Sequence, residues 1–251
     1  MDNNFKNQLM NDFSISERDF YSKNNIFTLN KPTDDFLFHN RSDFSLICTA
    51  NKVFMRSENP VLINKLREKF IAYQGAWFAE AANIRELEKI LGEFGMGIDN
   101  FFPLMTFSDR KVGVRDFDFR TIGIDEIQNF KELTRMSFCF DEDDRLGLAY
   151  YDGDSLIAVA GASYSGKYIW DIGLEKFNGD EKYQGLAASL LRKLSLLIRE
   201  ENPDISPITT TQFSHNRSIN MAIRAGYEMN LCITGREKKA NICLDFIDKS
   251  I

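Results

Sequence analysis

One amphipathic segment limits the folds open to this chain more than any other part of the sequence. Over Gln184–Glu201, apolar residues recur at spacings of three and four, which predicts a helix with a single apolar stripe. Such a stripe has to be buried against another element. The segments before and after it, Tyr168–Leu174 and Ile208–Phe213, are short and rich in apolar and β-branched residues, as is typical of strands. This order predicts an α/β unit in which the helix packs on a sheet.

The rest of the second half of the chain extends this unit. Asp152-Gly153 between two apolar runs predicts a tight hairpin, and Thr234-Gly235 predicts a closing one. The whole order is β-α-β-β-β-α-β-α-β-β, which indicates a mixed, mostly antiparallel α/β (α+β) sheet flanked by helices. The other expected elements are strands at Val114–Ile122, Leu146–Tyr151 and Leu156–Ala162, helices at Asp125–Phe138 and Ser214–Ala225, and closing strands at Leu231–Ile233 and Ala240–Phe246.

The first 112 residues are less regular and predict a smaller α+β domain of unknown role. Phe44–Cys48 and Val53–Met55 form an expected hairpin. Asn59-Pro60 opens a helix whose inward side carries Val61, Ile63, Leu66 and Phe70, and Asn83 caps a second helix. Gly95–Lys111, with Pro103 and several glycines, is expected to be a connector. We therefore place a domain boundary at 112, giving domains 1–112 and 113–251.

Composition excludes several classes of function. The 251 residues carry a formal charge of -6 and a pI of about 5.1, which argues against a nucleic-acid partner held by its phosphates. An acidic protein favours a cationic substrate. Its 2 histidines, His39 and His215, are too few for a typical His-ligated zinc site, so no metal is expected. The 4 cysteines form no CxxC pair and are expected to be buried and reduced: Cys48, Cys139, Cys232 and Cys243.

Membrane association is not expected either. No apolar run approaches the roughly 18 residues needed to cross a bilayer. The amino terminus is polar and mixed in charge, unlike a signal peptide. We therefore expect a cytoplasmic protein.

The start of the long helix is a candidate phosphate site. Free N–H groups of a first helical turn and the helix dipole together attract anions, and Gly185 would let a ligand approach the backbone closely. Lys182 would add a positive charge. Taken by itself, a glycine at a helix start is more often a matter of close packing.

Three segments resemble the GNAT N-acetyltransferase superfamily over roughly residues 114–251. Lys182-x-x-Gly185-Leu186-Ala187 resembles its acetyl-CoA signature (Q/R)-x-x-G-x-(G/A), with Lys in the first place. Ser218–Tyr227 resembles the second motif, a helix ending in A-G-(F/Y). Ala160–Ser163 followed by Ile169–Leu174 resembles a bacterial subgroup with an extra N-terminal region. The resemblance implies a GNAT-like sheet and acetyl-CoA as cosubstrate.

The same resemblance implies residues that hold the coenzyme. The strand before the loop pairs its backbone with the pantetheine arm, and the loop amides hold the pyrophosphate. The thioester is then expected in the splay between this strand and Ile208–Phe213. The residues implied are Ile172, Gly173, Leu174 and Lys176 for pantetheine, Lys182, Tyr183, Gln184, Gly185, Leu186, Ala187 and Ala188 for pyrophosphate, and Asn216 and Asn220 from the second motif.

Acyl transfer to an amine needs a base that removes a proton from the amine and an acid for the leaving thiolate. Asp171, in an apolar strand, is the first candidate base, because poor solvation raises a carboxyl pKa. Glu175 is the second. For both residues the more common alternative is a side chain that faces solvent on an alternating strand. The family often uses a Tyr as acid, but Ala222 stands at that place, and His215 is the alternative acid or a simple helix cap.

The leading hypothesis is an acetyl-CoA-dependent N-acetyltransferase that acts on a small primary amine. The rival is a non-catalytic acyl-CoA-binding or sensing protein, favoured by Ala222. A third hypothesis keeps the fold but fills the cleft with side chains. Tyr164 and Trp170 are weaker candidates for lining the acceptor site, and Phe101, Phe102 and Trp77 are expected to help the N-terminal region form one of its walls. A homodimer is left open.

Overall fold

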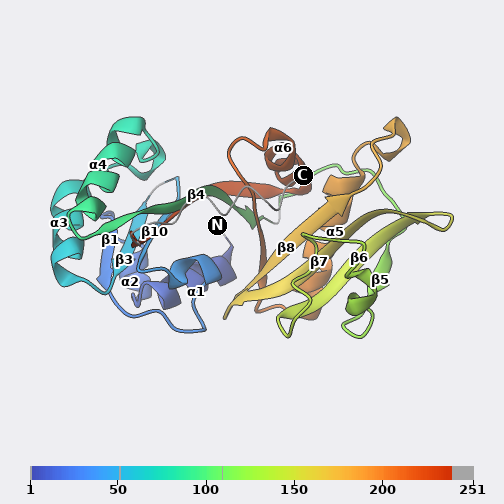
Figure 1. Cartoon of the computed structure of the whole chain (residues 1–251), viewed down its shortest axis with the longest axis horizontal. Coiled ribbons are helices and arrows are strands. Elements are labelled where there is room, and N and C mark those ends of the chain that lie inside the picture. The colour runs from blue at the N-terminus through green and yellow to red at the C-terminus, as the bar shows by residue number, and fades with distance from the viewer. Residues whose placement is uncertain (1, 51, 109, 239–251) are drawn as a thin grey trace.

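The computed structural model describes residues 2–50, 52–108 and 110–238, and its strands form one mixed sheet of ten (Figure 1). Seven neighbouring pairs are antiparallel, while β1–β3 and β8–β9 are parallel. The expected mixed, mostly antiparallel α/β sheet is therefore confirmed. In sheet order the strands are β1 (Ile26–Leu29), β3 (Val53–Ser57), β2 (Phe44–Cys48), β10 (Tyr227–Glu237), β4 (Met96–Phe107), β9 (Ser206–Thr210), β8 (Ile169–Lys176), β7 (Ser155–Gly166), β6 (Asp144–Asp152) and β5 (Arg120–Ile122).

The helices flank this sheet, and their ends follow from local sequence. Asn59 caps α3 through its side chain, which accepts hydrogen bonds from the amides of Val61 and Leu62. Gly226, in the left-handed conformation at φ 101°, ends α6. The helices are α1 (Asn3–Asp12), α2 (Glu17–Phe20), α3 (Pro60–Phe70), α4 (Ala81–Gly92), α5 (Leu186–Glu201) and α6 (Asn216–Ala225), with 3₁₀ turns at Phe38–Arg41, Gly75–Trp77, Ile127–Phe130 and Glu181–Tyr183.

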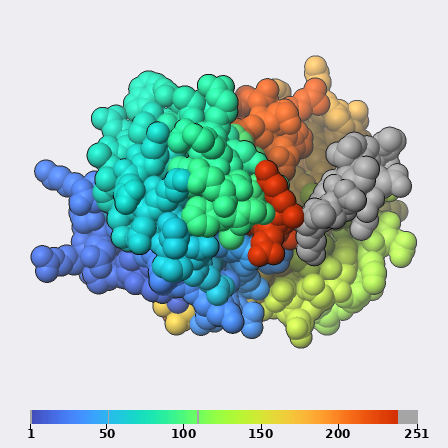
Figure 2. Space-filling model, turned by 60° about the vertical axis from the view of Figure 1, so that its left-hand side comes forward, coloured from blue at the N-terminus to red at the C-terminus, as the bar shows by residue number. Residues whose placement is uncertain are grey.

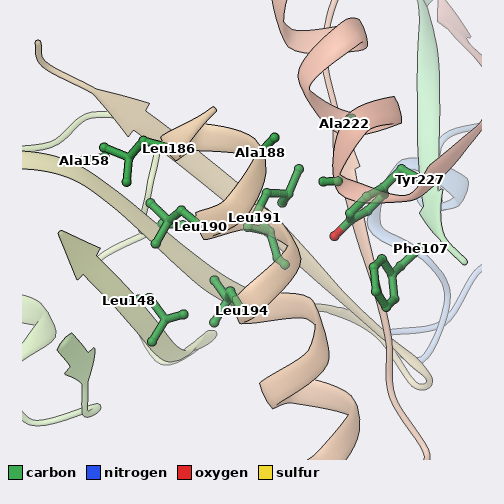
Figure 3. Packing of buried hydrophobic residues seen from close by; sticks show 14 of the residues in the cluster. Phe107, Leu148, Ala158, Leu186, Ala188, Leu190, Leu191, Leu194, Ala222 and Tyr227 are labelled. Atoms are coloured by element: carbon green, nitrogen blue, oxygen red, sulfur yellow. The ribbon is translucent and has the colours of Figure 1, made fainter. Parts of the chain in front are cut away.

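The predicted apolar stripe of α5 forms the centre of the largest core cluster. Leu186, Leu190, Leu191 and Leu194 are fully buried. Figure 3 shows them between strand residues such as Leu148 on one side and the Tyr227 region on the other. The long helix thus packs on the sheet as its periodicity predicts.

The expected connector Gly95–Lys111 is wrong, because most of it is the twelve-residue strand β4. Its glycines and Pro103 favoured a loop. Pro103 pairs with Leu231 of β10 and lies just before Leu104, where pairing with β9 begins. At position 103, β4 is paired with β10 but not with β9, so a residue without an N–H donor is tolerated there.

Two further expectations fail in the middle of the chain. Asp125–Phe138 contains a single 3₁₀ turn instead of a helix, and the strand expected over Val114–Ile122 is reduced to β5. The closing turn predicted at Thr234-Gly235 is also wrong, because strand β10 continues through these two residues with a shift of register against β4. The second strand of the expected closing hairpin, Ala240–Phe246, lies outside the described residues.

Smaller corrections concern the first region. Val61 is 64% exposed, and Leu62 takes the inward place instead. The N-cap of α4 is Glu80, while Asn83 lies in the first turn and donates from its side chain to the carbonyl of Trp77. The hairpin of β2 and β3 and the start of α3 are as predicted.

The sheet continues across position 112. β10 lies between β2 and β4, and β4 also pairs with β9, so strands from both parts of the sequence alternate. Figure 2 shows the side of the molecule covered by residues of the α3–α4 region, with the end of β10 in red beside them. The boundary at 112 stays a prediction. In the described ranges, no helix is long and apolar enough to span a membrane.

Candidate functional site

A gap opens inside the sheet where β8 and β9 separate. The two parallel strands pair at three positions, the last of them Asp171 with Ile208. Thr209 then donates from its hydroxyl to the carbonyl of Ile172 at 2.8 Å, so the backbone of Ile172 faces the gap. Because the direction of backbone groups alternates along a strand, the N–H and C=O of Leu174 face it too. The expected splay between these strands is present.

A cavity of about 440 Å³ occupies this gap, a size typical of small-molecule sites. Side chains of β8 and of the loop before β6 form one wall, and the β9–α6 connection and α6 form the other. The lining residues are Met105, Arg135, Met136, Ser137, Phe138, Cys139, Ser163, Asp171, Ile172, Gly173, Leu174, Thr209, Thr210, Thr211, His215, Ser218, Met221 and Ala222. The sequence interpretation missed the threonines, Ser218, Ser163, Cys139 and Arg135.

One wall of the cavity is the segment 134–140, which lies directly on three glycines. Gly147, Gly161 and Gly173 are opposite one another on β6, β7 and β8. A Cβ atom at Gly161 would collide with the Ser137 carbonyl and the Phe138 ring, and one at Gly173 with the Met136 carbonyl. The row of glycines is therefore what allows this segment to approach the strands and form the wall.

Two carboxylates hold the segment 134–140 in place. Oε1 of Glu175 accepts hydrogen bonds from the amides of Arg135 at 2.7 Å, Met136 at 2.6 Å and Ser137 at 3.1 Å. Asp144 accepts from the amides of Cys139 and Phe140 and from the Ser163 hydroxyl. Glu175, the second candidate base, is thus an anchor for the wall, and Asp144 is buried.

Asp171 lies on the same face of β8 as Gly173 and lines the cavity. Burial of the carboxyl raises its pKa to about 7, partly opposed by a hydrogen bond from the Ile172 amide. A carboxylate with this pKa accepts a proton close to neutral pH. The surroundings therefore suit Asp171 to the role expected of it from the sequence.

His215 also lines the cavity, at the start of α6. Its Nδ1 lies 3.0 Å from the Ser218 hydroxyl and 3.4 Å from that of Thr211. Ala222 is buried on the next turns of the same helix and contributes to the lining. Asn216 and Asn220, by contrast, are exposed and do not line this cavity.

The helix-start loop has the geometry of an anion site. Gly185 caps α5 in the left-handed conformation at φ 86°, and no side chain caps the helix. The first amide with a partner inside the helix is that of Ser189, bonded to the Gly185 carbonyl. The side chains of Leu186 and Ala188 point into the core, so these residues offer only their amides.

The cations around this loop differ from the expectation. Lys182 is paired with Asp152 at 2.6 Å, which also accepts from the Tyr183 hydroxyl, and Lys176 donates to the Tyr183 carbonyl at 3.1 Å. Arg115 reaches the loop instead, donating to the Lys182 carbonyl at 3.0 Å, while its own carbonyl accepts from Ser189. No sequence pattern marked Arg115, because it lies 67 residues from Lys182.

Several weaker candidates lie elsewhere. Trp170 belongs to the core, and Tyr164 donates to the carbonyl of Asp34. Phe102 is also buried, while Phe101 packs against Phe213 outside the cavity. Trp77 is 60% exposed. From the first 112 residues, Met105 is the lining residue.

The cysteines and possible metal ligands complete the survey. Cys48 and Cys232 are buried as expected, but Cys139 is exposed at the cavity, and Cys243 lies outside the described residues. Within the ranges that the structure describes, no cluster of His, Cys, Asp and Glu is arranged to hold a metal ion.

Comparisons with known proteins give distant structural likenesses. No family model matches the sequence, and no curated protein is significantly similar to it. A GCN5-related N-acetyltransferase from Kribbella flavida is 16% identical over 62% of this chain and 65% of its own, with a TM-score of 0.43. A GCN5-related N-acetyltransferase-like protein from Streptococcus suis is 14% identical over 84% and 89%, with a TM-score of 0.38.

A functionally unknown conserved protein from Staphylococcus epidermidis is 14% identical over 89% of this chain and 98% of its own, with a TM-score of 0.37. At these identities and scores, the likenesses do not indicate what this chain does. The function has to be inferred from the site itself.

Proposed function

We propose that the protein is an acetyl-CoA-dependent N-acetyltransferase that acts on a small primary amine. The observation that carries the proposal is the cavity in the gap between β8 and β9, with Asp171 in its wall. Two substrates have to meet in such a reaction, and the separation of β8 and β9 provides a cavity where they can do so. The α6 region contributes to the lining of this cavity, and the helix-start loop follows β8 in the chain, which supports the GNAT resemblance.

The coenzyme has residues that fit its parts. Along the edge of β8, the carbonyl of Ile172 already accepts from Thr209, so the backbone groups of Leu174 are the ones that suit the amides of a pantetheine arm. The amides of Leu186, Ala187 and Ala188 suit a pyrophosphate, with Arg115 as the nearby cation. Lys182 contributes less than the resemblance implies, because Asp152 holds it.

The coenzyme supplies an acetyl thioester, whose carbon forms a bond to the amine nitrogen as the bond to sulfur breaks. The nitrogen has to lose a proton first, and the Asp171 carboxylate accepts it. His215, hydrogen-bonded to Ser218, is the group of the lining that can return a proton to the leaving sulfur. Segment 134–140 forms one wall of the site.

A second candidate is an acyl-CoA-binding protein without catalysis, and the observation that favours it is Ala222. This small buried residue lies where the resemblance places a tyrosine acid, so His215 would have to replace it. The two candidates differ in turnover and agree in coenzyme binding.

The test mixes the full-length protein with acetyl-CoA and a panel of small primary amines, and follows free thiol. We expect thiol release that depends on both the amine and the protein, together with a rise in melting temperature on addition of CoA. Stabilisation by CoA without turnover of any amine would favour the binding protein. Absence of both effects would contradict both candidates.

A further inference from the structure

Arg135 is a cation of the cavity wall whose guanidinium has no partner among the residues that the structure describes. The residue is exposed and belongs to the lining. Its hydrogen bond within the protein is made by its backbone amide, to Glu175. An exposed arginine by itself indicates nothing, so two other features have to support a role.

The first feature is the rigidity of the backbone that carries Arg135. Glu175 binds the amides of three successive residues there, and Asp144 binds the far end of the same segment. Gly173 brings the Met136 carbonyl onto β8. The Arg135 side chain therefore starts from a fixed point on the cavity wall, as a residue that positions a ligand has to do.

The second feature is the charge of the lining. Among the lining residues, Arg135 is the basic side chain and Asp171 the acidic one. The other polar residues of the lining are serines, threonines, Cys139 and His215. The three amides of 135–137 are already bonded to Glu175 and cannot bind an anion. The whole-chain charge of -6 favoured a cationic acceptor, but this lining offers one group of each sign.

We propose that the acceptor is an amino acid-like molecule, a primary amine that also carries a carboxylate, and that Arg135 binds this carboxylate while Asp171 faces the amine. The proposal rests on the proposed N-acetyltransferase function and names its substrate class. A guanidinium presents two parallel N–H donors that match a carboxylate, which an ammonium does not. The carboxylate is unchanged by the reaction, so it serves recognition alone.

The test uses pairs of amines that differ in the carboxylate: phenylalanine with phenethylamine, leucine with isopentylamine, and 4-aminobutyrate with butylamine. Thiol release with acetyl-CoA gives kcat/KM for each. In at least one pair, we expect the carboxylate-bearing member to be preferred by about 10- to 100-fold, the range for charge-assisted hydrogen bonds. Arg135→Ala should abolish the preference by raising the KM of that member, and Arg135→Lys should restore part of it.

The matched control is Lys131→Ala, which removes an exposed cation just before the same segment and outside the lining. It should leave the preference and both KM values unchanged. The KM for acetyl-CoA should stay constant in Arg135→Ala. A rise in that value with no change for the amines would assign Arg135 to the coenzyme and overturn the proposal.

A binding experiment separates this proposal from the function on which it rests. Calorimetry with CoA present compares N-acetylphenylalanine with N-acetylphenethylamine in the wild type and in Arg135→Ala. Tighter binding of the former that is lost in the variant supports the proposal even where turnover is slow. Equal binding of the two, or equal turnover within every pair, would overturn it while leaving the acetyltransferase function intact. Absence of CoA binding would instead refute the function.

Discussion

Asp171 and Glu175 lie four positions apart on the same face of β8, and their surroundings give the two carboxylates different tasks. Glu175 accepts three backbone amides and so holds the wall segment. Asp171 opens on the cavity, and burial raises its pKa to about 7. The sequence alone offered both as candidate bases, Asp171 first and Glu175 second. Their hydrogen-bond partners separate them.

Asp171→Asn should lower kcat by about 100-fold or more, because the amide side chain cannot accept the amine proton. The carboxyl has to be deprotonated to act, so wild-type activity should rise with pH through a limb near pH 7 and level off above it. Initial rates of thiol release between pH 5.5 and 9 measure this. A limb of unchanged position in the variant would show that another group is the base.

Glu175→Gln tests the anchoring role at the neighbouring position. We expect a loss of about 1–3 kcal/mol in the free energy of unfolding, since three charge-assisted hydrogen bonds are weakened. The KM of the acceptor should rise more than that of acetyl-CoA, while the pH limb stays in place. Urea denaturation and the same pH profile supply the readouts. Loss of the limb near pH 7 in this variant would show that Glu175, and not only Asp171, acts as a base.

At the scale of elements, the cavity wall depends on a match between a loop and three strands. The predicted helix over Asp125–Phe138 is replaced by a loop whose conformation is imposed by distant partners. Gly147, Gly161 and Gly173 supply the space, and Glu175 and Asp144 supply the acceptors. Each of these residues looks ordinary in its own strand, so local sequence cannot reveal their joint effect.

Gly173→Ala should therefore lower the free energy of unfolding by about 1–3 kcal/mol, because its Cβ atom would overlap the backbone of Met136 and Ser137. Gly179→Ala is the matched control, since nothing lies within 4 Å of a Cβ atom there. It should change stability by less than about 0.5 kcal/mol. Urea midpoints of the two variants give the comparison. Equal midpoints would show that segment 134–140 can shift away from position 173 with little loss of free energy of unfolding.

For the molecule as a whole, strand β4 is the main link between the early and late parts of the chain. It pairs with β10 along its whole length and with β9 at Leu104–Thr106, and it places Met105 in the cavity lining. Its side chains Phe102, Leu104, Met105 and Phe107 are buried. The two expected domains thus share a sheet and, through Met105, a site.

A fragment of residues 113–251 should accordingly fail to fold cooperatively, although it holds every motif of the GNAT resemblance. Without β4, both β9 and the long strand β10 lose a neighbour and expose apolar side chains. Circular dichroism during thermal unfolding, compared with that of the full chain, gives the readout. A sharp transition that shifts upwards on addition of CoA would contradict this prediction.

The local sequence determined the parts of this protein that depend on neighbours in the chain. The leucine stripe of α5, the hairpin at Asp152-Gly153 and the left-handed glycines at 185 and 226 follow from helical periodicity and from the backbone freedom of glycine. The splay was implied by the GNAT resemblance, while Asp171 and His215 were singled out by their chemistry and their places at a strand and a helix start.

Tertiary structure alone decided what distant residues do together. It inserted β4 between β9 and β10, fixed segment 134–140 on three glycines, tied Lys182 to Asp152 and brought Arg115 and Arg135 to the site. The physical reason is that hydrogen bonding and burial act through space. A segment of weak local preference, such as 134–140, adopts the conformation that its partners across the fold stabilise.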